Sequence, residues 1–437
     1  MKKSLLAVAA LGAFASAAQA QSSVTVYGIM DIGYVGANSR VAGGAVGNNL
    51  VTKGTQNSIL SGAESTSRLG FKGTEDLGGG SSAFFTIELG LNPAESTSGF
   101  KNSATTENRQ SFVGLKKNGI GQFALGTQYT LVHQSVALTD AGGTNNILGD
   151  MIYTSGTGST ANAADPNFAV NNGFALGNSY TIRSQNTLTL DTDTFAGFKG
   201  HGLVIMNNAN ASQTTLPGNL GYTGGTNNQN GWGLGVDYTW NKLFVTAALQ
   251  QLSAKNSYSI PASLATATSA NAATIQSALN VNNFGAGQAS SLGNNVKDNQ
   301  YYVGATYDFG ILKAYAQYVS RKITAQQDSS FYGKRTGQQI GVRSFITPTI
   351  EAWAQGGLGK TQAFPGITTV NGNVGYTNNG GANLTSWQIG SNYWLSKRTN
   401  LYAIYGQVGT SNVTIVGNTN PSSFNASNYA IGLRHTF

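Results

Sequence analysis

Basic side chains that alternate with apolar ones are the residues of this chain best placed to do chemistry. Arg68 and Lys72 alternate with Leu69 and Phe71 in the stretch SRLGFKG. Because successive side chains of a β-strand point to opposite sides, the two cations share one face and the two apolar residues share the other. Such a strand separates water from an apolar environment, which is the core of a soluble sandwich or the lipid around a membrane barrel.

Arg109 and Arg183 show the same arrangement. Arg109 lies on the face opposite Phe112, and Arg183 lies on the face opposite Ile182 and Leu188. A guanidinium group stays charged at physiological pH, so it suits a surface whose charge should not titrate. The alternative for each arginine is a structural ion pair with a nearby carboxylate, and the sequence leaves both interpretations open.

Other kinds of chemistry find little support. His133, His201 and His435 are far apart and lack the spacing of paired zinc ligands, and the chain has no cysteine. The stretch AQGGLGKT at 354–361 fits a phosphate-binding loop only loosely, because its first position is alanine and no helix is expected after it. We therefore predict no metal, no cofactor and no enzymatic activity. A hydrolase is kept as an alternative, and His133 near Ser135 is the only candidate pair of base and nucleophile for it.

The N-terminal residues predict export. A charged start, MKK, precedes the apolar run Leu5 to Ala17, and the tripeptide AQA at 18–20 has the pattern of a cleavage site. We expect residues 1–20 to be a signal peptide and residues 21–437 to form the mature domain. No run of 18 or more apolar residues follows, so a membrane span would have to consist of strands.

Composition favours β-structure. Charged residues make up 10% of the chain, against about 25% in ordinary soluble domains, whereas there are 58 glycines, 19 tyrosines and 19 phenylalanines. Without the two lysines of the signal peptide, 25 − 2 = 23 basic residues face 17 acidic ones, an excess of six. The basic residues are dispersed rather than gathered in runs, so no nucleic-acid partner is predicted.

Segments in which apolar and polar residues alternate recur along the whole chain. The connections between them are by turns short and long, and the long ones are polar. We count sixteen segments of about ten residues, the length of a strand that crosses a bilayer at a tilt. They lie at 24–35, at 65–91 (two strands about the turn 75–81), and at 108–116, 122–129, 180–190, 201–207, 231–240, 242–252, 300–309, 311–321, 336–346, 349–358, 384–395, 400–409 and 428–437. The pattern predicts an all-β, transmembrane, antiparallel up-and-down β-barrel of 16 strands, with a long polar loop at 36–64.

Several of these stretches resemble the trimeric, sixteen-stranded general porins of Gram-negative outer membranes, most closely their β-proteobacterial branch. They are VTVYGIMDIGY, SRLGFKGTEDLGGG, NRQSFVGLK, YWLSKRTNLYAIYG and the C-terminal IGLRHTF. The resemblance implies a homotrimer in the outer membrane, in contact with lipopolysaccharide, that forms a water-filled channel for passive diffusion of ions and small hydrophilic solutes. The alternating C-terminal strand, which ends at Phe437 and is interrupted by His435, is similar to the signal read by the outer-membrane assembly machinery.

The resemblance also implies a constriction, in which a long third loop folds into the lumen and faces basic residues on the wall. By motif, Arg68, Arg109 and Arg183 match the wall arginines, and Lys72 shares the face of Arg68. The loop is expected at about 130–179.

The acidic side of this constriction is less well defined by the sequence. The acids of the loop are Asp140, Asp150 and Asp165, of which the first two are the better candidates to face the arginines; Gly142-Gly143 stands where some relatives have an acidic tip. Cations outnumber these acids, so we expect weak to moderate anion preference that lessens as salt rises. The remaining alternative is an adhesin, in which the long loops carry the function and the lumen is plugged.

Overall fold

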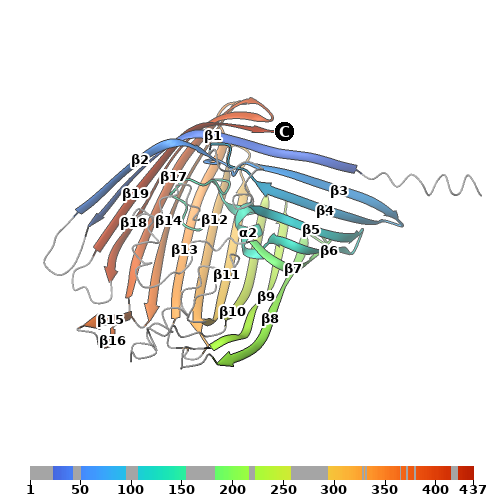
Figure 1. The fold of residues 1–437 in the computed structure, drawn as a ribbon. Helices are drawn as coiled ribbons and strands as arrows, with labels where there is room; N and C mark the ends of the chain where they lie inside the picture. The colour runs from blue at the N-terminus through green and yellow to red at the C-terminus, as the bar shows by residue number, and fades with distance from the viewer. Residues whose placement is uncertain are drawn as a thin grey trace, which may run out of the picture.

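Long antiparallel strands curve around an interior that holds the helix α2 (Leu131–Thr139) (Figure 1). The computed structural model describes residues 23–42, 51–94, 107–153, 183–215, 222–256, 294–326, 329, 332–364, 366–370, 373–377, 380–414 and 422–437. Within these ranges, no helix is long and apolar enough to cross a membrane. The signal peptide expected at 1–20 lies outside them.

One sheet of seventeen strands makes the wall. Its strands are β1 (Ser23–Ala42), β2 (Val51–Ser61), β3 (Arg68–Gly78), β4 (Ser81–Gly90), β5 (Asn108–Lys117), β6 (Gly121–Tyr129), β7 (Arg183–Thr192), β8 (Phe198–Thr215), β9 (Tyr222–Trp240), β10 (Leu243–Asn256), β11 (Asn294–Asp308), β12 (Lys313–Ala325), β13 (Tyr332–Phe345), β14 (Ile350–Phe364), β17 (Gly380–Ser396), β18 (Thr399–Thr414) and β19 (Ser422–Thr436). A separate hairpin consists of β15 (Gly366–Val370) and β16 (Asn373–Thr377).

The sheet closes on itself through its first and last strands. Apart from β2 and β3, consecutive strands of the sheet pair in antiparallel fashion, and β1 pairs with β19 on one side and with both β2 and β3 on the other. Strands β2 and β3 lie end to end along β1, since Ile32 pairs with Ser61 and Ile29 pairs with Arg68. They therefore occupy one position in the wall, which makes a closed barrel of sixteen strand positions and confirms the predicted fold class.

The polar stretch predicted as a loop at 36–64 is mostly strand, so that prediction was wrong. Strand β1 continues to Ala42, and β2 returns along it from Val51 to Ser61. The alternation of apolar and polar residues marks only the part of a strand that has an apolar environment on one face. Beyond that part, backbone hydrogen bonds extend the strand pairing although the sequence shows no hydrophobic pattern. For the same reason β9 is longer than the predicted segment 231–240.

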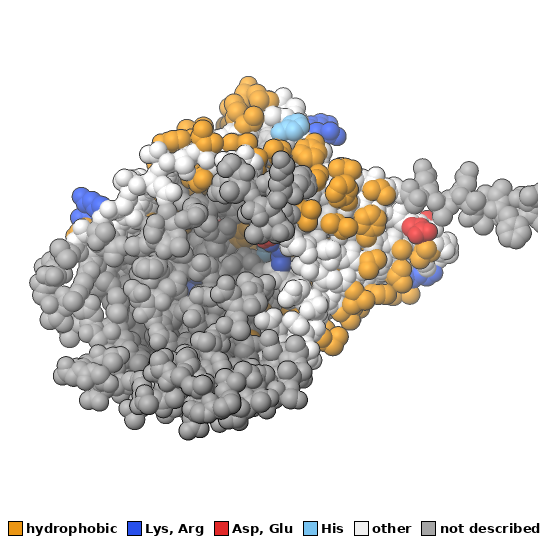
Figure 2. Space-filling model, viewed as in Figure 1, with side chains coloured by type: hydrophobic (Ala, Val, Ile, Leu, Met, Phe, Trp, Pro, Cys, Tyr) orange, Lys and Arg blue, Asp and Glu red, His pale blue; other side chains and the backbone are white. Residues whose placement is uncertain are grey.

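Apolar side chains cover the outside of the wall where alternation was predicted. On β9 the outward side chains of Trp232, Leu234, Val236 and Trp240 are 43 to 61% exposed. Figure 2 shows such apolar side chains spread over the described outer surface. An apolar exterior on a closed sheet is the surface that a lipid bilayer requires.

Short turns join the strands at one end of the barrel. The turn between β3 and β4 consists of Gly78, Gly79 and Gly80, whose φ angles of 80°, 59° and 75° are readily adopted only by glycine. Short turns also join β5 to β6, β11 to β12 and β13 to β14, whereas the long connections lie at the opposite end. Barrels of outer membranes place short turns in the periplasm and long loops outside.

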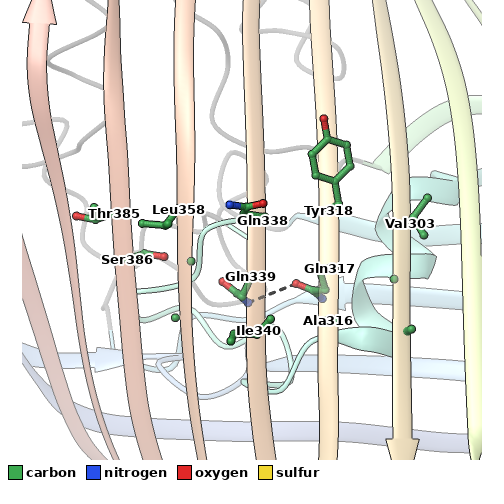
Figure 3. Close-up of a pocket in the computed structure, with 14 residues that line it drawn as sticks. Val303, Ala316, Gln317, Tyr318, Gln338, Gln339, Ile340, Leu358, Thr385 and Ser386 are labelled. Carbon is green, nitrogen blue, oxygen red and sulfur yellow. Dashed lines mark hydrogen bonds between the residues drawn. The ribbon is translucent and has the colours of Figure 1, made fainter.

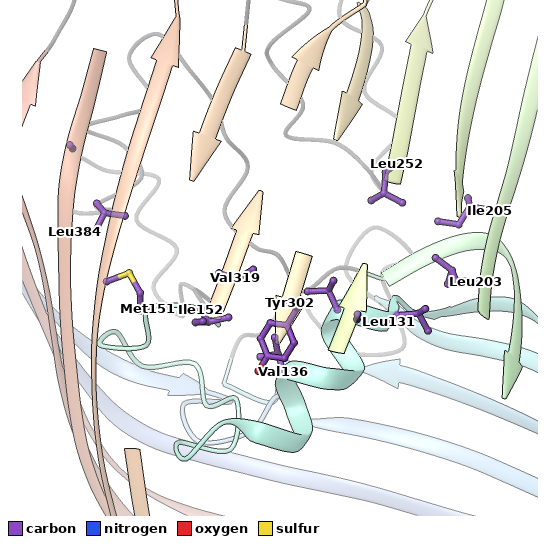
Figure 4. Packing of buried hydrophobic residues seen from close by; sticks show 13 residues of the cluster. Leu131, Val136, Met151, Ile152, Leu203, Ile205, Leu252, Tyr302, Val319 and Leu384 are labelled. Carbon is purple, nitrogen blue, oxygen red and sulfur yellow. The ribbon is translucent and has the colours of Figure 1, made fainter. Parts of the chain in front are cut away.

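The segment after β6 lies inside the barrel, as predicted. Apolar residues of α2 and of the chain after it, Leu131, Val136 and Ile152, pack with Leu203 of β8 and Tyr302 of β11 (Figure 4). Farther along, the described part of this segment reaches the opposite wall. The loop expected at 130–179 is described as far as Tyr153, and Asp165 lies outside the described residues.

At that opposite wall, Ile147 packs with Val35 of β1, Trp353 of β14 and Tyr402 of β18. The residues from 130 to 153, called the inner loop below, therefore cross the lumen.

Candidate channel constriction

Glu88 is the centre of the basic cluster on the inner wall. Its Oε1 atom lies 2.7 Å from Nε of Arg109 and 3.7 Å from Nη1 of Arg68, and its Oε2 accepts a 3.1 Å hydrogen bond from the hydroxyl of Tyr27. The strand register explains this meeting, since Glu88 on β4 pairs with Gly70 on β3 and with Gln110 on β5. Arg68 and Arg109 thus share one carboxylate.

The two arginines differ in exposure. The Arg109 side chain is 5% exposed and also donates a 2.8 Å hydrogen bond from Nη2 to the hydroxyl of Tyr129. The Arg68 side chain is 20% exposed and donates from Nε to the carbonyl of Thr66. For Arg109 the structure therefore shows the ion pair that the sequence left open as an alternative, whereas Arg68 retains contact with the lumen.

Arg183 and Lys72 complete the cluster. Arg183 forms an ion pair with Glu107, and its guanidinium lies 5.4 Å from the centre of the Tyr129 ring. The Lys72 ammonium lies 5.5 Å from the centre of the Tyr27 ring and makes no ion pair with a described residue. Four cations against Glu88 and Glu107 leave 4 − 2 = +2 on this part of the wall.

Asp140 and Asp150 do not face this cluster. Both are buried between the inner loop and the wall, where Gln339 of β13 donates to each of them and Gln355 of β14 donates to Asp150. Asp140 also accepts from the backbone N–H groups of Gly142 and Thr144, so it closes the turn that follows α2. The expectation that these carboxylates oppose the arginines is corrected, because the backbone of their own loop turns them toward the glutamines.

Burial and the neighbouring Asp150 carboxylate raise the pKa of Asp140 well above the usual aspartate range. The native loop therefore binds a proton that the unfolded chain releases, so stability should fall as the pH rises from the usual aspartate range through the raised pKa. The Asp140→Asn variant should lose this part of the pH dependence. The check is the temperature of barrel unfolding measured between pH 4 and pH 9 for both proteins; equal slopes would contradict the assignment.

A belt of six inward glutamines holds the inner loop, and it was not predicted from the sequence. They pair across neighbouring strands as Gln250 with Gln300, Gln317 with Gln339 and Gln355 with Gln388. Figure 3 shows the 3.3 Å hydrogen bond between Gln339 and Gln317. All six alternate with outward residues along their strands, so a row of glutamines at matching strand positions was the signal available in the sequence.

The glutamine belt bonds to the backbone of the inner loop. Gln250 accepts from the N–H of Val132, Gln355 from that of Gly142 and Gln339 from that of Met151. In addition, Gln388 donates to the carbonyls of Ile147 and Leu148 and exchanges hydrogen bonds with the amide of Asn145. Main-chain groups that enter a barrel must find partners there, and these amides supply them.

Further ion pairs line the inner wall, and no sequence motif predicted them. Arg343 pairs with Glu351 at 2.6 Å, and Arg434 lies 3.4 Å from Glu64. Arg321 binds the buried Asp298 through Nε and Nη2. Each pair joins one cation to one carboxylate, so these pairs add no net charge to the wall away from β3 to β5.

Phe437 lies at the seam between the first and last strands. Its backbone exchanges two hydrogen bonds with Gly28 of β1, at 3.0 and 3.1 Å. Its ring lies over Gly28, where an added Cβ atom would come within 2.3 Å of the ring. A small residue at position 28 therefore leaves room for the terminal aromatic ring.

A closed antiparallel barrel with an apolar exterior, a charged inner wall and a loop across its lumen is the architecture of an outer-membrane channel. The chain belongs to the family described as Gram-negative porin, whose model matches residues 7–343. It is 27% identical to an outer membrane porin protein of Bordetella pertussis, with all of both chains covered. It is also 35% identical over 204 residues to outer membrane porin protein 32 of Delftia acidovorans, covering 45% of this chain and 48% of that one.

Solved structures share the fold. The anion-selective porin from Comamonas acidovorans superimposes with a TM-score of 0.59 at 20% identity, covering 95% of this chain and 100% of that one. The trimer form of OmpT from Vibrio cholerae gives a TM-score of 0.54 at 13% identity, with 95% and 99% covered. Family membership confirms an outer-membrane channel protein and not an enzyme.

Proposed function

We propose that this porin is a general diffusion channel with weak to moderate preference for anions. The observation that carries the proposal is the basic cluster of Arg68, Lys72 and Arg183 beside an inner loop whose own carboxylates, Asp140 and Asp150, are turned away from the lumen. A ring with a net positive charge attracts anions and repels cations. Because the Debye length at physiological salt is about 8 Å, the field extends across a narrow opening and weakens as salt rises.

The preference should be modest because part of the basic charge is neutralised. Glu88 pairs with Arg68 and Arg109, and Glu107 pairs with Arg183 and lies 3.9 Å from Arg109, so the excess is two charges rather than four. Ions and small hydrophilic solutes would pass the constriction without a dedicated binding site. The Comamonas acidovorans porin, which shares the fold, is anion-selective, and this agrees with the proposed sign.

The remaining features of the proposal come from the resemblance. They are export through residues 1–20, assembly as a homotrimer, contact with lipopolysaccharide, and recognition of the strand that ends at Phe437 by the outer-membrane assembly machinery. The trimer form of OmpT supports the oligomeric state through the shared fold. Crosslinking of the protein in its native membrane would test it, with a band at three times the monomer mass as the expected result.

Selectivity is tested by the reversal potential of the refolded protein in a planar bilayer under a KCl gradient. The wild type should prefer chloride, and the variant Arg68→Ala with Arg183→Ala should have lost most of that preference. As a charge-matched control, Lys322→Ala with Lys360→Ala removes two cations that lie on the outward faces of β12 and β14 and should leave the potential unchanged. A potassium-selective wild type would refute the proposal.

A further inference from the structure

The wall contains a large bulge between the end of β2 and the start of β3 (Figure 1). Residues 62–67, called the wall bulge below, stand opposite only two residues of β1, so most of them have no place in the ladder. Gly62 begins the bulge with a φ of 79°, a conformation that glycine adopts readily. Ala63 is buried and belongs to the same apolar cluster as Ile147 of the inner loop. The wall bulge therefore turns into the barrel and meets the inner loop.

Asp31 fixes the wall bulge to β1. Its buried side chain accepts hydrogen bonds at Oδ2 from the backbone N–H groups of Glu64 and Ser65, at 2.9 and 2.6 Å. Its Oδ1 accepts a 2.6 Å hydrogen bond from the hydroxyl of Tyr402 on β18. The hydroxyl of Ser67 donates to the backbone carbonyl of Asp31. Hydrogen bonds to a carboxylate are stronger than those between neutral groups, so this anchor holds the bulge in one conformation.

The wall bulge in turn holds the side chain of Arg68, the residue that follows it. Nε of Arg68 donates to the carbonyl of Thr66 at 2.9 Å, and Nη2 donates to the hydroxyl of Ser65 at 3.1 Å. The 3.7 Å separation from Glu88 is longer than a direct hydrogen bond. Neutral oxygen atoms of the bulge therefore orient this guanidinium, rather than its carboxylate partner.

Asn146 joins the inner loop to the wall bulge. Its backbone N–H donates to the carbonyl of Ala63 at 2.9 Å. Its side-chain Nδ2 donates to the carbonyl of Gly62 at 2.7 Å and to the hydroxyl of Thr66 at 3.1 Å. Thr66 is also the residue whose carbonyl accepts from Arg68. Hydrogen bonds thus run from the inner loop, through one residue of the bulge, to a guanidinium of the basic cluster.

We propose that Asn146 is a positioning residue, which sets the direction of the Arg68 guanidinium through the wall bulge and thereby tunes the ion selectivity of the channel. Without the Asn146 side chain, the bulge keeps its anchor at Asp31 but loses the contacts that hold Thr66 from the side of the inner loop. The guanidinium can then turn from the Thr66 carbonyl toward Glu88. A closer ion pair there would reduce the positive charge that ions in the lumen meet.

Reversal potentials under a KCl gradient test the proposal on four proteins: the wild type, Asn146→Ala, Arg68→Ala and the variant with both substitutions. Asn146→Ala changes no charge, yet it should reduce the preference for chloride, by less than Arg68→Ala does. In the Arg68→Ala background it should cause no further shift, because the group that it positions is absent. Non-additivity of this kind identifies two residues that act through one another.

Ser65→Ala provides a second neutral variant. It removes one acceptor of Arg68, and among the printed side-chain contacts of the described residues it leaves those of Asn146 in place. It should shift the potential in the same direction as Asn146→Ala, and this shift too should vanish in the Arg68→Ala background. An unchanged temperature of unfolding for each variant would show that the barrel is intact.

The matched control is Asn145→Ala. The Asn145 side chain exchanges hydrogen bonds with Gln388 of β17 and makes no printed contact with the wall bulge among the described residues. Any shift that it causes comes from the width of the opening, so it should be the same with and without Arg68. The proposal fails if neither Asn146→Ala nor Ser65→Ala shifts the potential, or if their shifts are equally large in the Arg68→Ala background.

The direction of the expected shift rests on the anion preference proposed above, whereas the coupling between Asn146 and Arg68 does not. A wild type that prefers potassium would therefore refute that proposed function. The cycle of four proteins would still decide whether Asn146 acts through Arg68, because it compares shifts and not the sign of the selectivity.

Discussion

Replacing Gly406 by alanine should raise the single-channel conductance and weaken ion selectivity, because the new side chain displaces the inner loop. Gly406 is on β18, and a Cβ atom added there would lie 1.6 Å from the carbonyl oxygen of Leu148. The obstacle is backbone, which cannot rotate away as a side chain can. The loop must leave the wall at Leu148, which also strains its hydrogen bonds to Gln388.

The displacement should be local. Each hydrogen bond from Gln388 contributes about 0.5–1.5 kcal/mol and overpacking costs about 1–3 kcal/mol, both small against the stability of a closed barrel. The barrel should therefore still fold while the opening widens. Conductance in a planar bilayer at 1 M KCl, where screening minimises charge effects, measures the width of the opening.

Gly235→Ala is the matched control. Gly235 is on β9 beneath α2, where a Cβ atom would meet its neighbours at 3.4 Å or more, an ordinary contact distance. This variant should conduct like the wild type. If Gly406→Ala also conducts like the wild type, the segment around Leu148 does not define the narrowest part of the channel.

Replacing Glu88 by glutamine should destabilise the barrel and increase its anion preference at the same time. Glu88 is buried, and the substitution puts a neutral amide in place of the carboxylate that lies 2.7 Å from the Arg109 guanidinium. That guanidinium is 5% exposed and, among the described residues, keeps only the longer 3.9 Å ion pair with Glu107. Breaking a buried ion pair from one side costs about 3–5 kcal/mol. The wall cluster gains one unit of net positive charge, from +2 to +3, so the reversal potential should shift further toward that of chloride.

Glu107→Gln separates the two effects. It changes the charge of the cluster by the same amount, but the Glu107 side chain is 53% exposed. The loss of its ion pair with Arg183 and of its 3.9 Å contact with Arg109 should therefore cost no more than about 1 kcal/mol. Unfolding in denaturant and reversal potentials should be measured on both variants. Equal losses of stability would mean that Arg109 is not desolvated in the native protein.

The sequence was sufficient to predict the features of the fold that depend on a repeated pattern of apolar and polar residues. Alternation gave the number of strand positions, because one face of every strand meets an apolar environment, as Trp232 and Leu234 do on β9. It did not give the lengths of β1 and β2, because pairing between polar segments leaves no periodic signal. Arg68 and Arg109 could be placed on the inner face, but their shared partner Glu88 depends on the register between three strands.

The inner loop was predictable only in outline. Its entry into the barrel followed from the resemblance, whereas the direction of Asp140 and Asp150 depends on a turn and on Gln339 and Gln355, which come about 200 residues later. Contacts at such separations carry no local signature in one sequence. To predict these contacts, one would need to know the height of each residue along the barrel axis. Turn geometry and strand register together determine that height.

The seam between β1 and β19 bears on how the chain reaches its native state. Until Phe437 has been added and meets Gly28, both strands are unpaired edges that can hydrogen-bond to any other extended chain. The ladder that closes the barrel joins residues about 400 positions apart, so its loop-closure entropy is the largest of any ladder in the wall. A chain that lacks its final strand would keep two such edges, with self-association as the main competitor to closure.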